Sequence, residues 1–138
     1  MNPEHFISRL ELAAQPEAVR WARRHGRDVL RAWHVPDDHV DTTTLVVSEL
    51  VTNAVQHVVS TSPTAPPVRV ALTLHHRRTH LIVEVADPDT RPPRKPGVVS
   101  PQSEGGRGLF IVESVAKEWG YCLPPTGGKV VWCLLPLE

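Results

Sequence analysis

The sequence predicts an α+β fold, a two-layer sandwich in which about three helices cover one face of a mixed, mostly antiparallel sheet. Strand-like segments with alternating apolar residues and helix-like segments with a 3.6-residue period occur in one chain of 138 residues. Several of the expected strands are joined by short connections, as in hairpins. A chain of this length supports one domain, which we expect to span residues 1–138.

The first part of the chain predicts a strand followed by two helices. A short strand is indicated by the apolar residues Phe6, Leu10 and Leu12. Between Val19 and Trp33 the apolar residues fall at helical spacing, and Pro16 suits the first turn of that helix. A longer helix is expected from about residue 37 to residue 59, with Asp37 or Asp38 as its N-cap.

The second part predicts four strands and one more helix. Apolar residues alternate with other residues over 68–74 and again over 81–85. The helical period returns from Leu109 to Ala116. Two final strands are expected around 119–123 and 129–135, joined by a turn that contains Gly127 and Gly128.

The segment from Pro88 to Pro101 holds five of the 14 prolines of the chain. Proline clusters mark loops, and a long loop without regular structure is unusual in a small domain unless it has a function. We therefore expect residues 88–104 to form a lid over a site.

The charge balance and the cysteine content exclude several classes of protein. Fifteen basic and fifteen acidic residues give no net charge, which argues against a strong electrostatic attraction to nucleic acid or to an anionic membrane. No apolar run reaches 18 residues and the N-terminus does not resemble a signal peptide, so a cytoplasmic protein is expected. A hairpin centred on Gly127 and Gly128 would place Cys122 opposite Cys133. A cytoplasmic location, however, favours free thiols over a disulfide.

The second expected helix carries a polar stripe beside its apolar face. With Glu49 placed at 0°, Asn53 falls at about 40° and His57 at about 80° on a helical wheel. An amide oxygen can coordinate Mg²⁺, and a carboxylate one turn away can take a proton or orient a water molecule. Alternatively, Glu49 and Asn53 form the solvated side of an amphipathic helix.

Asp87 continues the alternation of Leu81, Val83 and Val85, so it should point toward the core. A buried carboxylate is costly unless its oxygens accept hydrogen bonds, and the exocyclic amine of a purine is one possible donor. The other interpretation is that Asp87 opens the turn Asp87-Pro88-Asp89, where aspartate is common.

A glycine-rich run, Gly105-Gly106-Arg107-Gly108, precedes the third expected helix. Glycines allow a close approach of the backbone to a ligand, and a helix N-terminus offers unpaired N–H groups to an anion. Arg107 could add charge. The run therefore indicates a phosphate site, unless it is a flexible hinge before a helix.

Taken in order, these segments resemble the ATP-binding domain shared by gyrase, the Hsp90 chaperones, histidine kinases and MutL. The segment Ser48-Glu49-Leu50-Val51-Thr52-Asn53-Ala54-Val55-Gln56-His57 resembles the asparagine box of the stand-alone anti-sigma factor kinases of bacteria. The segment Gly106-Arg107-Gly108-Leu109-Phe110-Ile111-Val112 resembles their second glycine box, and Gly128-Lys129-Val130-Val131-Trp132 their closing strand. The resemblance extends from about Phe6 to Leu135.

The resemblance implies a role for each matching residue. Glu49 would be the general base, Asn53 would bind Mg²⁺ between the phosphates, and Asp87 would accept a hydrogen bond from the adenine amine. The remaining nucleotide-binding positions would be His57, Gly105, Gly106, Arg107, Gly108 and Leu109. Proteins of this kind typically use ATP to phosphorylate a serine of an anti-sigma-factor antagonist, sequester a sigma factor, and often form homodimers.

The chain departs from the family pattern at the first glycine box. The family has Asp-x-Gly-x-Gly, whereas this chain has Asp87-Pro88-Asp89-Thr90-Arg91. The closing strand has Val130 where the family often has threonine. Two functions therefore remain open: an ATP-dependent serine/threonine kinase and anti-sigma factor, and a non-catalytic module that keeps the fold and sequesters a partner with weak or no nucleotide binding.

Overall fold

The five strands of the described residues form one antiparallel sheet. The structure is a computed structural model that describes residues 5–57, 68–93 and 111–137, without the side chain of His57. The strand order is β1-β2-β3-β5-β4, and each neighbouring pair is antiparallel. The strands are β1 (His5–Ala13), β2 (Arg69–Arg77), β3 (His80–Asp87), β4 (Glu118–Cys122) and β5 (Lys129–Pro136).

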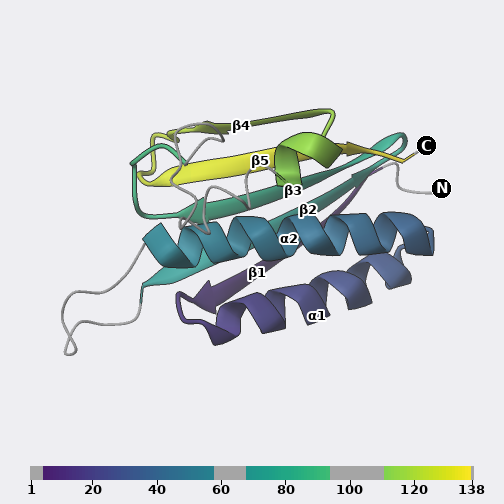
Figure 1. Cartoon of the computed structure of the whole chain (residues 1–138), viewed down its shortest axis with the longest axis horizontal. Helices are drawn as coiled ribbons and strands as arrows, with labels where there is room; N and C mark the ends of the chain where they lie inside the picture. Colours follow the sequence, from purple (N-terminus) through teal and green to yellow (C-terminus); the bar gives the residue numbers. More distant parts are fainter. Residues whose placement is uncertain (1–4, 58–67, 94–110, 138) are drawn as a thin grey trace.

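Helices α1 (Glu17–Ala32) and α2 (Asp37–His57) lie together on one face of the sheet (Figure 1). Residues 111–115 are also helical, and Val112 is buried in the same core. The two-layer α+β sandwich predicted from the sequence is therefore confirmed. Its sheet is antiparallel throughout the described strands rather than mixed. None of the described helices combines the length and the apolar character needed to span a bilayer.

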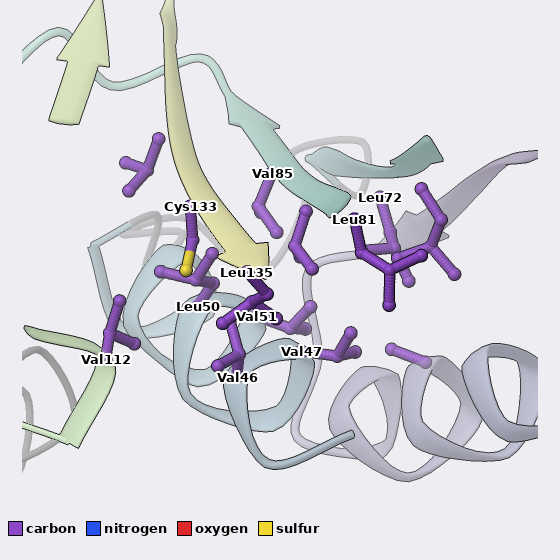
Figure 2. Packing of buried hydrophobic residues seen from close by; sticks show 14 of the residues in the cluster. Val46, Val47, Leu50, Val51, Leu72, Leu81, Val85, Val112, Cys133 and Leu135 are labelled. Atoms are coloured by element: carbon purple, nitrogen blue, oxygen red, sulfur yellow. The ribbon is translucent and has the colours of Figure 1, made fainter. Parts of the chain in front are cut away.

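The core lies between α2 and the inner face of the sheet, because the apolar period of each element faces the other. Figure 2 shows Val46, Val47, Leu50 and Val51 of α2 directed toward side chains of the strands. The strand residues labelled in that view are Leu72, Leu81, Val85, Cys133 and Leu135. This contact fixes the rotation of α2 about its axis, and with it the direction of the polar residues of the helix.

Backbone hydrogen bonds define the C-terminal end of α1 and the N-terminal end of α2. After α1 the chain turns at His34, which has a φ of 61°, and the N–H groups of His34 and Val35 donate to the carbonyls of Arg31 and Leu30. This is a Schellman motif with histidine at the position that usually holds glycine. Helix α2 begins at Asp37, as expected, and the N–H of Val40 donates to the carbonyl of Pro36, the residue before the helix.

The expected capping role of Asp37 or Asp38 is therefore wrong. Both residues lie within the first turn of α2. There their negative charges interact favourably with the positive end of the helix dipole.

The expected pairing of Cys122 with Cys133 is also wrong. In the β4–β5 register Cys122 is opposite Val130, and Cys133 is opposite Trp119. Successive residues of a strand point to opposite faces, so the exposed Cys122 and the buried Cys133 lie on different sides of the sheet. Both are free thiols, and burial raises the pKa of Cys133 to about 12.

We predict that Leu50→Ala lowers the free energy of unfolding by about 2–5 kcal/mol, because it removes a fully buried side chain from the contact between α2 and the sheet. Urea denaturation followed by circular dichroism measures the loss. Leu45→Ala on the exposed side of the same helix is the control and should change stability by less than about 0.5 kcal/mol. Equal losses in the two variants would contradict the observed rotation of α2.

Candidate functional site

Three segments that are distant in the sequence end at the same side of the molecule. The C-terminal end of α2, the end of β3 and the beginning of β5 all lie at the left of Figure 1. They carry Asn53, Asp87 and Lys129, each of which is buried although it is polar. Buried polar groups are rare unless they have partners, so this end of the fold is the candidate site.

Asn53 is only 2% exposed. The packing of α2 against the sheet turns this position inward, so the alternative that Asn53 lies on a solvated face is wrong. Its Oδ1 atom has no hydrogen-bond partner within the described residues. Leaving a buried acceptor without a partner costs about 1–3 kcal/mol, and such an atom calls for a specific explanation.

Glu49 lies one turn before Asn53 and is partly buried. Burial raises the pKa of its carboxyl group, because a charged carboxylate is poorly solvated there. A carboxylate with a raised pKa is a stronger base than one in water. Glu49 therefore has the property that proton abstraction requires.

Asp87 is buried as its alternation predicts, and it also opens the turn as the second interpretation proposed. Its Oδ1 accepts a hydrogen bond of 2.8 Å from the N–H of Asp89. The same carboxylate forms an ion pair with Lys129, whose Nζ lies 3.3 Å from Oδ1 and 3.2 Å from Oδ2. The two interpretations of Asp87 are thus compatible.

Lys129 is a buried residue of the site that the sequence did not single out: it was expected only as the first residue of the last strand, after the turn glycines Gly127 and Gly128. Its side chain is 0% exposed. The signal was present in the alternation, since Lys129 is in phase with Val131 and Cys133 on the inner face of β5. The β3–β5 register places it directly opposite Asp87.

The turn that replaces the first glycine box is held by its own ion pair. The guanidinium of Arg91 donates to Asp89 Oδ2 at 2.8 Å, and the Arg91 N–H donates to Asp89 Oδ1 at 2.8 Å. These hydrogen bonds hold the pKa of Asp89 well below its usual range. The guanidinium of Arg91 thus has a local partner in this turn.

Several predicted site residues lie outside the described residues. These are the side chain of His57 and the glycine-rich run with Gly105, Gly106, Arg107, Gly108 and Leu109. Of the lid expected over 88–104, the structure describes residues 88–93. Gly127 and Gly128, predicted to belong to a hairpin turn, have φ values of 100° and 71° in the connection between β4 and β5.

A hollow of about 440 Å³ lies near the same end of the sheet but on its other face. Its lining includes Ala71 and Ala86, which are cross-strand partners and alternate with the inward-facing residues of β2 and β3. Asn53 does not line it. The hollow reaches Asp87 and Pro88 at the end of β3, so it borders the candidate site without including Asn53.

The oxygen ligand that Asn53 offers suits a Mg²⁺ ion that is also bound by phosphates. It suits less well a metal ion that is held by protein side chains alone. No group of three or more His, Cys, Asp or Glu side chains within the described residues could hold a metal ion. Mg²⁺ in proteins commonly takes one or two protein oxygens and completes its shell with phosphates and water. The Oδ1 atom of Asn53 is a suitable oxygen for this role.

Comparison with known proteins agrees with this arrangement. The family model described as "Histidine kinase-like ATPase domain" matches residues 12–133. An uncharacterized protein of Streptomyces coelicolor is 39% identical over 70 residues, which cover 50% of this chain and 66% of that protein. The crystal structure of the RsbU and RsbW domains of Rv1364c from Mycobacterium tuberculosis matches with a TM-score of 0.63 and 20% identity, over 94% of this chain and 32% of that one.

The fold and the position of the buried polar residues define a domain of the ATPase type. The family model covers most of the chain, so the protein belongs to the histidine kinase-like ATPase domain family. The structural match shows that the fold is shared with a chain about three times longer.

We predict that Glu49 makes stability fall as pH rises. Its pKa is higher in the folded than in the unfolded protein, so the folded state holds this proton more tightly and loses stability as the group ionises. The free energy of unfolding should therefore decrease as the pH rises above the ordinary glutamate pKa of 4.5. Urea denaturation of the wild type and of Glu49→Gln measures this contribution, which the variant should lack. Identical pH profiles would show that Glu49 is not buried as described.

Proposed function

We propose that the protein binds Mg²⁺ and ATP and regulates transcription as an anti-sigma factor that phosphorylates a serine or threonine of an anti-sigma-factor antagonist. One observation carries the nucleotide part of this proposal: the buried Oδ1 atom of Asn53 has no hydrogen-bond partner in the part of the chain that the structure describes. In a member of the histidine kinase-like ATPase family, a metal–phosphate group is the simplest ligand that would satisfy it.

The proposed chemistry assigns separate roles to two residues of α2. Asn53 would hold Mg²⁺ through its amide oxygen, and the metal would neutralise phosphate charge when bound. Glu49, one turn earlier, would accept the proton of the attacking hydroxyl group, since burial raises its pKa. Phosphoryl transfer needs little from a protein beyond positioning and charge stabilisation, so this small set of groups is sufficient.

The remaining phosphate contacts are assigned to Gly105, Gly106, Arg107, Gly108 and Leu109, at the start of the third helix. Backbone N–H groups at a helix N-terminus bind phosphate, as the sequence pattern suggests. His57 would lie near the nucleotide at the end of α2, and residues 88–104 would form the lid. All these roles belong to a single domain over residues 1–138.

The protein partners are proposed from similarity. The asparagine box and the second glycine box resemble those of anti-sigma factor kinases, and the matching crystal structure contains an RsbW domain. A sigma factor, an antagonist protein and a second copy of the chain are the partners that this similarity suggests. A cytoplasmic location agrees with such partners.

A second function is favoured by the turn that replaces the first glycine box. Pro88 and the Asp89–Arg91 ion pair stiffen the backbone where the family has two glycines. A non-catalytic module that sequesters its partner, with weak or no nucleotide binding, is therefore the alternative. Nucleotide titration separates the two functions.

Asn53→Ala should weaken the binding of Mg-ATP by roughly tenfold or more, because it removes the proposed metal ligand. Isothermal titration calorimetry measures the affinity, and an excess of EDTA should weaken wild-type binding in the same way. Gln56→Ala removes an amide from the exposed side of the same helix and should leave the affinity unchanged. If the wild type binds no ATP at about 1 mM nucleotide, the sequestering module is the correct function.

Glu49→Gln should slow phosphoryl transfer by about 10²–10⁴-fold, the usual contribution of a general base, while the affinity for Mg-ATP stays the same. Phosphoserine formed on purified bacterial antagonist proteins can be quantified by mass spectrometry. Glu17→Gln, the same substitution at an exposed position of α1, is the control. Normal turnover of Glu49→Gln would remove Glu49 from the chemistry.

A further inference from the structure

The ion pair between Asp87 and Lys129 is completely enclosed. Both side chains are 0% exposed. The ammonium group lies 3.3 Å and 3.2 Å from the two carboxylate oxygens and donates to the carbonyl of Asp89 at 3.1 Å. The ammonium group thus donates hydrogen bonds to Asp87 Oδ1 and to the Asp89 carbonyl, and Asp87 Oδ2 lies at ion-pair distance.

The backbone around the pair is closely packed. A Cβ atom on Gly128 would collide with the carbonyl oxygen of Asp87, so glycine is required there for the hairpin to approach the end of β3. The positive φ of Gly128 is a second reason for glycine at this position. This approach places Lys129 opposite Asp87 and lets its side chain reach the carbonyl of Asp89.

The two charges of such a buried pair contribute to stability together rather than independently. A buried charge is costly when its partner is removed, whereas removal of both charges together is often tolerated. Lys129 therefore holds Asp87 in place and connects β3, β5 and the turn that begins at Pro88. The side chain of Asp87 is 0% exposed, and both of its oxygens lie within 3.3 Å of the Lys129 ammonium group.

We infer that Asp87 and Lys129 form a structural clamp, and that Lys129 withdraws Asp87 from recognition of the purine base. A carboxylate that reads an exocyclic amine discriminates strongly between adenine, which carries this amine, and guanine, which has a carbonyl group in its place. In this chain the choice between the two bases does not depend on Asp87. The statement about base recognition rests on the proposed nucleotide binding. The existence of the clamp is independent of that proposal.

The clamp can be tested on the wild-type protein by acetylation of lysine with an N-hydroxysuccinimide ester. Lys129 should react at least about 100-fold more slowly than the exposed Lys117, as measured by peptide mass spectrometry over time, because a buried ammonium must be exposed before it reacts. The two lysines should react at the same rate after denaturation in urea. Equal rates in the folded protein would overturn the inference.

The second test uses Asp87→Asn, Lys129→Met and the double variant. Each single variant should lower the melting temperature by roughly 10 °C or more, and the double variant should regain at least half of the summed loss. Additive effects, or single variants as stable as the wild type, would contradict a clamp. Asn at position 87 keeps an acceptor for the Asp89 N–H, so the turn itself is preserved.

The third test compares Mg-ATP with Mg-GTP by calorimetry on the wild type and the double variant. The ratio of the two affinities should agree between the proteins within about threefold, as expected if Asp87 does not contact the base. A change of more than about tenfold in this ratio would show that Asp87 contacts the base and would overturn the inference. If neither protein binds nucleotide, the proposed function fails, and the acetylation and melting experiments still decide whether the clamp exists.

Discussion

The contact between α2 and the inner face of the sheet determines the position of each candidate functional residue on this helix. Val46, Val47, Leu50 and Val51 are almost completely buried against the strands. Because an α-helix is rigid over this length, its apolar contact also sets the direction of Asn53, which is turned into the interior. The polar site is thus a consequence of core packing.

Asp87 and Asn53 are both buried, but their polar atoms have different partners. Asp87 is buried together with a cation, so its charge is compensated within the chain. The Oδ1 atom of Asn53 is buried without a partner among the described residues. A satisfied group needs no ligand, whereas an unsatisfied one is stabilised by binding one. This contrast is the basis on which we propose a structural role for Asp87 and a ligand-binding role for Asn53.

Periodicity predicted most of the fold, because the burial of one face imposes a period of two on strands and of 3.6 on helices. It also predicted that Asp87 points inward. The helix cap was wrong by one residue and the cysteine pairing by three, because each depends on an exact position along the chain, which periodicity does not fix. Lys129 was missed because a lysine beside two glycines is typical of an exposed turn, and its burial depends on a partner 42 residues away. The roles of Gly105 to Leu109 remain predictions.

The central claim is that the amide of Asn53 contacts a metal–phosphate group. The most direct measurement is to follow the side-chain NH₂ resonances of Asn53 by ¹⁵N–¹H NMR during a titration with Mg-ATP. We predict that these resonances shift as the nucleotide binds and return when EDTA removes the metal, because Oδ1 then loses its partner. Saturating Mg-ATP that shifts other residues and leaves the Asn53 resonances unchanged would contradict it.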